Sequence, residues 1–84
     1  MIARSTVTFA ELRQLLVDLG FTVSKSGKGW VFEHPPSETW FMYRPYRLRE
    51  RITPVDLDAT RKQLDWRDVL DEKTFDDRLK KASA

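Results

Sequence analysis

The chain contains no cysteine and a single histidine among its 84 residues. Without cysteine, neither a disulfide framework nor a thiolate zinc site can form, and one histidine excludes a histidine-rich metal site. No stretch approaches the ~20 consecutive apolar residues of a membrane-spanning helix, and the first residues lack the apolar run of an export signal. We therefore expect a cytoplasmic protein without metal, cofactor or membrane contact.

The small size and the uneven charge limit the function further. A chain of 84 residues is enough for one domain with one modest core, so we expect a single domain over residues 1–84. The net charge of +2 does not by itself indicate a nucleic-acid partner. However, residues 24–55 contain six basic and three acidic side chains, whereas residues 56–84 contain seven basic and eight acidic ones.

A first helix is predicted to begin near Phe9 and to end at Gly20. Thr8 can cap it and Glu11 can complete a capping box, while Gly20 can adopt the left-handed conformation that ends helices. Apolar residues recur at steps of three and four: Phe9, Leu12, Leu15, Leu16 and Leu19. This spacing predicts one apolar face.

Three strands should follow. Residues 21–24 alternate in polarity, and both "WVFEH" (30–34) and "TWFMYR" (39–44) are rich in aromatic or β-branched residues. The prolines of "PPSE" (35–38) cannot lie inside a strand ladder and mark a turn. An antiparallel meander is the simplest arrangement.

A second helix should begin after the basic connection "RPYRLRERI" (44–52). Thr53 can cap it, with Pro54 at its first position and Asp56 near its positive end. We expect it to reach Asp65 or beyond. Its buried side should consist of Val55, Leu57, Ala59 and Leu64.

The last part of the chain should pack less regularly. Trp66, Val69 and Leu70 are expected to form a packed segment, and Thr74 can cap a last short helix. The core should cover about residues 8–70, with a helical extension over 71–84. The sequence thus predicts an α+β domain (helix, three-stranded meander, helix) with both helices on one face of the sheet.

The motifs "LVDLGF", "WVFEHP" and "TPVDL", in this order of elements, resemble the HicA-type toxins over about residues 8–70. The resemblance implies a fold like the double-stranded-RNA-binding domain and action on messenger RNA as an mRNA interferase. It also implies control by a partner antitoxin.

One position departs from the family. HicA-type toxins carry a catalytic histidine after Gly-Ser or Gly-Thr on the loop entering the second strand. Aligned through Gly27 and the pair His34-Pro35, this chain has Lys28 and Gly29 there, so the catalytic residue cannot be carried over. The resemblance then implies an RNA-binding domain that is catalytically impaired or inactive.

His34 is the remaining candidate for catalysis. An imidazole can act as acid or base near neutral pH, which would allow a weak metal-independent ribonuclease. However, five residues of strand separate it from Gly29 by ~17 Å, with the opposite side-chain parity. It also has no identified partner, so a histidine at the end of a strand is the better interpretation.

Aromatic and basic residues cluster in the middle of the chain. Six of the ten aromatic residues lie between positions 30 and 46, directly before the arginine-rich connection. Such a mixture suits single-stranded RNA, whose bases stack on rings while cations bind phosphates. We expect Lys25, Lys28, Arg44, Arg47 and Arg49 to contact phosphates and Tyr43 and Tyr46 to stack on bases.

Two other interpretations of the aromatic residues stay open. Tyr, Trp and Arg are also enriched at protein interfaces, so the domain could instead be a protein-interaction module that binds an antitoxin-like partner. The rings could also simply fill a small core. Along the third strand, Phe41 and Tyr43 share one face and Trp40 and Met42 the other, so one face should carry exposed residues.

Two other sequence patterns are weaker evidence for a functional site. The loop 24–29 ("SKSGKG") could bring amides and an ammonium group to a phosphate, but it lacks the spacing of a Walker A motif. The carboxylates near the C-terminus alternate with basic residues, which predicts a solvated helix surface with salt bridges. They are Asp65, Asp68, Asp71, Glu72, Asp76 and Asp77.

Overall fold

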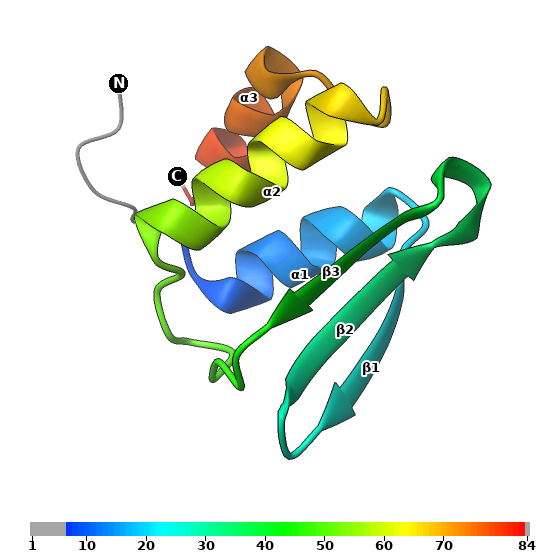
Figure 1. Cartoon of the computed structure of the whole chain (residues 1–84). Coiled ribbons are helices and arrows are strands. Elements are labelled where there is room, and N and C mark those ends of the chain that lie inside the picture. The colour runs from blue at the N-terminus through cyan, green and yellow to red at the C-terminus, as the bar shows by residue number, and fades with distance from the viewer. Residues whose placement is uncertain (1–6, 84) are drawn as a thin grey trace.

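The structure, a computed structural model, describes residues 7–83. Its elements are, in order, α1 (Phe9–Asp18), β1 (Thr22–Ser26), β2 (Gly29–His34), the 3-10 helix η1 (Pro35–Ser37), β3 (Thr39–Tyr43), α2 (Pro54–Trp66) and α3 (Glu72–Ser83). The strands form one antiparallel sheet in the order β1-β2-β3 (Figure 1). The predicted α+β class and its meander are confirmed.

The ends of α1 and the start of α2 follow their local sequence. Thr8 and Glu11 form the predicted capping box, because each side chain accepts a hydrogen bond from the other residue's backbone N–H. Gly20 adopts a φ of 99° directly after α1, which only glycine does readily. At α2, the Thr53 hydroxyl accepts from the Asp56 N–H at 3.2 Å, as expected for its cap.

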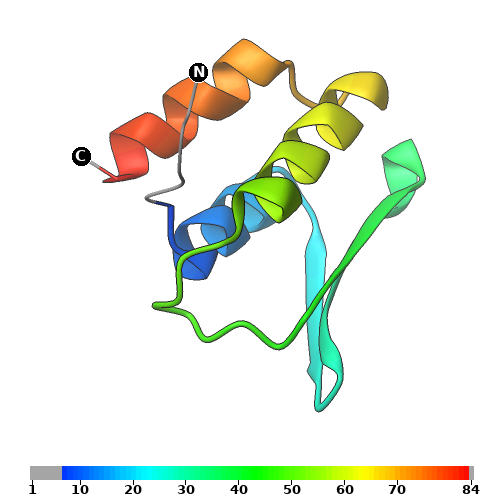
Figure 2. The same ribbon diagram turned by 60° about the vertical axis from the view of Figure 1, so that its left-hand side comes forward.

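The helices form two layers over one face of the sheet. Figures 1 and 2 show α1 and α2 against the sheet, with α3 behind them on the side away from the strands. The largest fully buried side chains are Phe9, Leu12, Leu16, Phe32, Tyr46, Ile52, Thr60, Leu64 and Phe75. Because Phe75 and Leu79 of α3 are buried, the core extends past the predicted limit at residue 70.

The buried stripe of α2 is narrower than predicted. Leu57 and Leu64 are buried together with Thr60, but Val55 is 77% exposed and Ala59 is also exposed. Positions 57, 60 and 64 share one side of a helix with 3.6 residues per turn, whereas 55 points elsewhere. The prediction for Val55 and Ala59 was therefore wrong.

The segment after α2 also differs from the prediction. Trp66 is 73% exposed rather than packed, while Val69 and Leu70 are half-buried as expected. The last helix begins at Glu72, before Thr74. Asp71 accepts hydrogen bonds from the Thr74 N–H (3.1 Å) and the Thr74 hydroxyl (2.7 Å), so Asp71 performs the capping expected of Thr74.

Within residues 7–83, no helix is long and apolar enough to cross a membrane.

Candidate nucleic-acid interface

The predicted phosphate-binding residues gather at one end of the sheet. The strand register places Lys25 of β1 beside Trp30 of β2, and Trp30 beside Tyr43 of β3. Gly29 lies against the start of the connection that follows β3, since a Cβ on it would be 3.3 Å from the carbonyl carbon of Arg44. The hairpin loop, the end of β3 and the basic connection therefore meet here.

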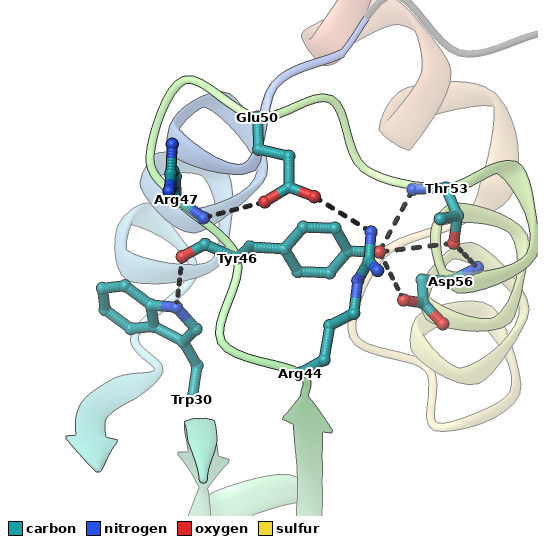
Figure 3. A network of polar contacts seen from close by, with 7 residues as sticks. All are labelled: Trp30, Arg44, Tyr46, Arg47, Glu50, Thr53 and Asp56. Atoms are coloured by element: carbon teal, nitrogen blue, oxygen red, sulfur yellow. Dashed lines mark hydrogen bonds and ion pairs between the residues drawn. The ribbon is translucent and has the colours of Figure 1, made fainter. Parts of the chain in front are cut away.

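Trp30 is the centre of this end of the sheet. Its indole N–H donates to the Tyr46 carbonyl oxygen at 3.0 Å (Figure 3), and its side chain is buried. The Lys25 ammonium lies 5.2 Å from the ring centroid and the Arg13 guanidinium 5.9 Å. Each of the two cations is therefore within the ~6 Å at which an aromatic ring attracts a positive charge.

Arg13 was missed by the sequence reasoning. It belongs to α1, four residues after Phe9, whose ring packs on Trp30 at 5.0 Å between centroids. That spacing puts Arg13 one helical turn from Phe9 and so beside the same tryptophan. We call the resulting surface the basic end; it consists of Arg13, Lys25, Lys28, Arg44, Arg47 and Arg49.

The connection that carries the arginines is anchored at both its ends. The carbonyls of Leu48 and Glu50 accept from the first N–H groups of α1, Ala10 and Phe9, at 2.9 and 2.8 Å. The Glu50 carboxylate binds the Arg44 guanidinium at 3.0 Å and the Arg47 N–H at 3.1 Å (Figure 3). Arg49 is exposed between the two anchored residues.

Most charges of the basic end have no counter-ion within residues 7–83. Arg44 pairs with Glu50, but no ion pair within the described part of the chain involves any of the other members. The Arg13 Nε is buried and has no hydrogen-bond partner among these residues. The basic end therefore keeps an uncompensated positive charge on a backbone fixed by its hydrogen bonds.

Tyr46 is not available to a base. It is 1% exposed, and its hydroxyl reaches the N-terminus of α2 (Figure 3). The hydroxyl donates to the Asp56 carboxylate at 2.6 Å and accepts from the Thr53 backbone N–H at 3.2 Å. The predicted stacking role of Tyr46 is wrong, because the ring fastens the connection to α2 instead.

Tyr43 is buried as well, at 7% exposure. Its hydroxyl lies 2.6 Å from the Thr60 hydroxyl, which itself donates to the Asp56 carbonyl at 2.9 Å, so Tyr43 is the donor to Thr60. Burial raises the pKa of the Tyr43 phenol. The predicted stacking of Tyr43 on a base is therefore also wrong, because its ring points into the core.

The alternation along β3 is as predicted. Trp40 is 60% and Met42 67% exposed, and both lie on the sheet face away from the helices. Phe41 and Tyr43 face the core, half-buried and buried respectively. The exposed ring of β3 is thus Trp40, on a different face from the rings that we expected to stack.

His34 lies at the last residue of β2, far from the basic end. Its Nδ1 is 2.7 Å from the Ser37 hydroxyl, and its ring stacks on Phe21 with 4.9 Å between centroids. Gly20 lies against the other edge of the ring. His34 therefore packs at the turn that follows its strand, five residues of β2 away from Gly29.

Gly29, which the resemblance aligns with a catalytic histidine, is required by packing. Its φ is 140°, and a Cβ at this position would lie 2.0 Å from the Tyr43 carbonyl oxygen. No side chain fits there without moving β3. Lys28, in contrast, is exposed in the turn, where its N–H donates to the Ser26 hydroxyl at 3.2 Å.

No protein-family model, curated protein or solved structure matches the chain. The resemblance to HicA-type toxins thus stays a prediction from short motifs and element order. In the described residues, no group of three or more histidine, aspartate or glutamate side chains could hold a metal ion.

Proposed function

We propose that the chain binds RNA through the basic end, as a HicA-like domain that lacks the family's catalytic histidine. The observation that carries the proposal is the pair Arg13 and Lys25, which flank Trp30 without a carboxylate partner in residues 7–83. Lys28, Arg47 and Arg49 add further charge that is not paired there. Phosphodiesters supply the negative charge that such a surface lacks.

The burial of both tyrosines changes the expected mode of recognition. Without an exposed ring among its own members, the basic end offers charge and N–H donors but no stacking platform. Contacts to phosphates position a nucleic acid and carry no sequence information directly. We therefore expect binding to a single-stranded RNA such as a messenger RNA, with weak sequence preference and strong dependence on salt.

Fluorescence anisotropy with a labelled single-stranded RNA tests the proposal. For three or four phosphate contacts the affinity should fall about 10- to 100-fold between about 50 and 200 mM salt. Lys28→Gln should lower the slope of log affinity against log salt by about one. Lys80→Gln removes the same charge from the exposed α3 surface and serves as the matched control, for which we expect no change.

Two results would contradict RNA binding at the basic end. One is the absence of a complex in low salt. The other is an equal loss of affinity in Lys28→Gln and Lys80→Gln, which would show that net charge alone matters. If the same reactions also showed RNA cleavage that disappears in His34→Ala, the ribonuclease hypothesis would replace the proposal of an inactive domain.

The second candidate function, a protein-interaction module, is favoured by a different surface. Trp40 and Met42 are large apolar side chains that the sheet leaves in solvent. Exposed apolar residues that lie together often mark a partner site. An antitoxin-like protein is the partner that the HicA resemblance implies.

A further inference from the structure

The open edge of β3 borders a channel of about 440 Å³. On the strand side it is lined by Trp40, Phe41, Met42 and Tyr43, and on the helix side by Asp56, Ala59, Thr60, Gln63 and Arg67 of α2. Figures 1 and 2 show α2 running beside β3, so the channel has a strand for one wall and a helix for the other.

The outer edge of β3 has backbone N–H and C=O groups that can bind another strand. β3 is the last strand of the sheet, and in residues 7–83 its backbone pairs only with β2. In an antiparallel ladder, alternate residues of an edge strand direct their N–H and C=O groups away from the sheet. Natural edges are usually protected by charged residues or proline, yet Thr39–Tyr43 ("TWFMY") contains neither.

The side chains around the channel specify what could enter it. Trp40 and Met42 protrude from alternate positions of β3, and Ala59 leaves space on α2 because it is small and exposed. The Arg67 guanidinium lies over the Trp66 ring at 4.8 Å and forms no ion pair within the described range. Glu38 also lines the channel, so the lining contains both a positive and a negative charge.

We infer that this channel binds an extended segment of a partner protein, which adds to the sheet as a fourth strand beside β3. Main-chain hydrogen bonds to the open edge would supply the affinity, and pockets for alternate side chains the specificity. On the sheet face away from α2, the segment should carry apolar residues at alternate positions, beside Trp40 and Met42. On its other face, towards α2, it should carry an acidic residue opposite Arg67.

Other occupants fit the channel less well. A second copy pairing through β3 would bring its own α2 to the same side of its strand, and the two helices would compete for one channel. RNA would place phosphates beside the carboxylates of Glu38 and Asp56, which repel them. An extended peptide, in contrast, is narrow, and its backbone groups have the same spacing as those of β3, so they can form hydrogen bonds along the whole edge.

The test begins with a phage-displayed library of random dodecapeptides, selected on the full chain. A synthetic peptide of the selected consensus is then titrated by calorimetry. Ala59→Arg and Trp40→Lys should each weaken its binding about tenfold or more, because the first fills the space beside α2 and the second removes the ring beside which the apolar residues of the segment lie. Val55→Lys changes another exposed apolar residue of α2, which lies outside the lining, and should leave the affinity unchanged.

Backbone N-methylation separates strand addition from simple apolar contact. Methyl groups on one set of alternate peptide nitrogens should abolish binding, while methyl groups on the other set should not, because only one set faces β3. Circular dichroism checks that each variant is folded; since all the changed side chains are exposed, we expect no loss of helix signal.

Several outcomes would overturn the inference. They are the failure to select any peptide, equal binding of the peptide to Ala59→Arg, and the same effect of both methylation patterns. Displacement of the peptide by RNA would assign the channel to the RNA surface instead. A dimer that Ala59→Arg dissociates would assign it to a second copy. None of the peptide results depends on RNA binding at the basic end.

Discussion

The charged side chains of the α2–α3 pair and those of the basic end are used in different ways. On α2, Arg61 binds three carboxylates: Asp58 at 2.5 Å, Asp76 at 3.1 Å and Glu72 at 3.4 Å. At the basic end only Arg44 has an acidic partner in residues 7–83. In the first region, charge joins two helices to each other, whereas in the second it remains available to a ligand.

The reason for this difference lies in spacing and composition. Helices bring residues three or four positions apart together, so several charges of α2 and α3 find partners within their own helix or on the other one. Residues 24–55 have twice as many basic as acidic side chains, and the carboxylate of Glu50 is already engaged. The excess positive charge there cannot be neutralised locally.

The largest effect that we predict concerns the backbone under the basic end. Gly29→Ala would place a Cβ 2.0 Å from the Tyr43 carbonyl oxygen, at a φ of 140°. We expect a loss of about 3 kcal/mol or more in the free energy of unfolding, measured by urea denaturation. Gly29→His, designed to restore the family's catalytic residue, should suffer the same loss.

Gly27→Ala is the matched control for this prediction. A Cβ on Gly27 would have nothing within 4 Å, so the free energy of unfolding should change by no more than about 0.5 kcal/mol. If Gly29→Ala were as stable as Gly27→Ala, the close approach of position 29 to the Tyr43 carbonyl would not require a glycine.

The next effect concerns Tyr46, which connects the two regions. Tyr46→Phe removes the hydroxyl that serves Asp56 and Thr53, and should cost about 1–3 kcal/mol in unfolding free energy because buried polar groups lose a partner. Its affinity for RNA, measured by anisotropy on folded protein, should be unchanged. Weaker RNA binding at unchanged stability would instead show that the Tyr46 hydroxyl takes part in RNA binding, which its contacts to Asp56 and Thr53 argue against.

A smaller effect should distinguish the two kinds of charge directly. Arg61→Met should lower the free energy of unfolding by about 1–2 kcal/mol, since three partly exposed carboxylates lose their common partner. Arg47→Met should change stability by less than about 0.5 kcal/mol but should weaken RNA binding. Urea denaturation and anisotropy on both variants would show whether Arg61→Met lowers mainly the stability and Arg47→Met mainly the RNA affinity.

The smallest predicted effect is an acid dependence of the helix pair. Hydrogen bonds from Arg61 and Lys62 lower the pKa of Asp58, which is partly exposed. A carboxylate with a lowered pKa stabilises the fold above its unfolded pKa, and this stabilisation is lost as the pH falls through the folded pKa, below about 4. The thermal midpoint should therefore fall on acidification, and less so in Arg61→Met.

Much of the fold could be predicted from residues close together in the chain. The capping box of Thr8 and Glu11, the left-handed Gly20 and the cap at Thr53 are interactions over one to three positions. The alternation of β3 likewise follows from strand geometry and correctly separated Trp40 and Met42 from the core-facing residues. Such local signals do not depend on what packs above them.

The composition of the candidate site depends on contacts between residues that are far apart in the sequence. Basic residues near one hairpin could be grouped from the sequence, but Arg13 joins them only because α1 crosses the sheet at Trp30. Similarly, a tyrosine beside arginines resembles a base-stacking residue until α2 covers it. An amphipathic ring such as tyrosine can lie inside or outside, and only its hydrogen-bond partner decides which.

The sequence by itself therefore determined the class of fold, the limits of most elements and the concentration of positive charge, because these follow from periodicity, caps and composition. The tertiary structure decided which rings are buried, why position 29 must be glycine and which cations remain unpaired. These properties arise where segments far apart in the chain come into contact, and a local sequence pattern cannot predict which distant segments do so.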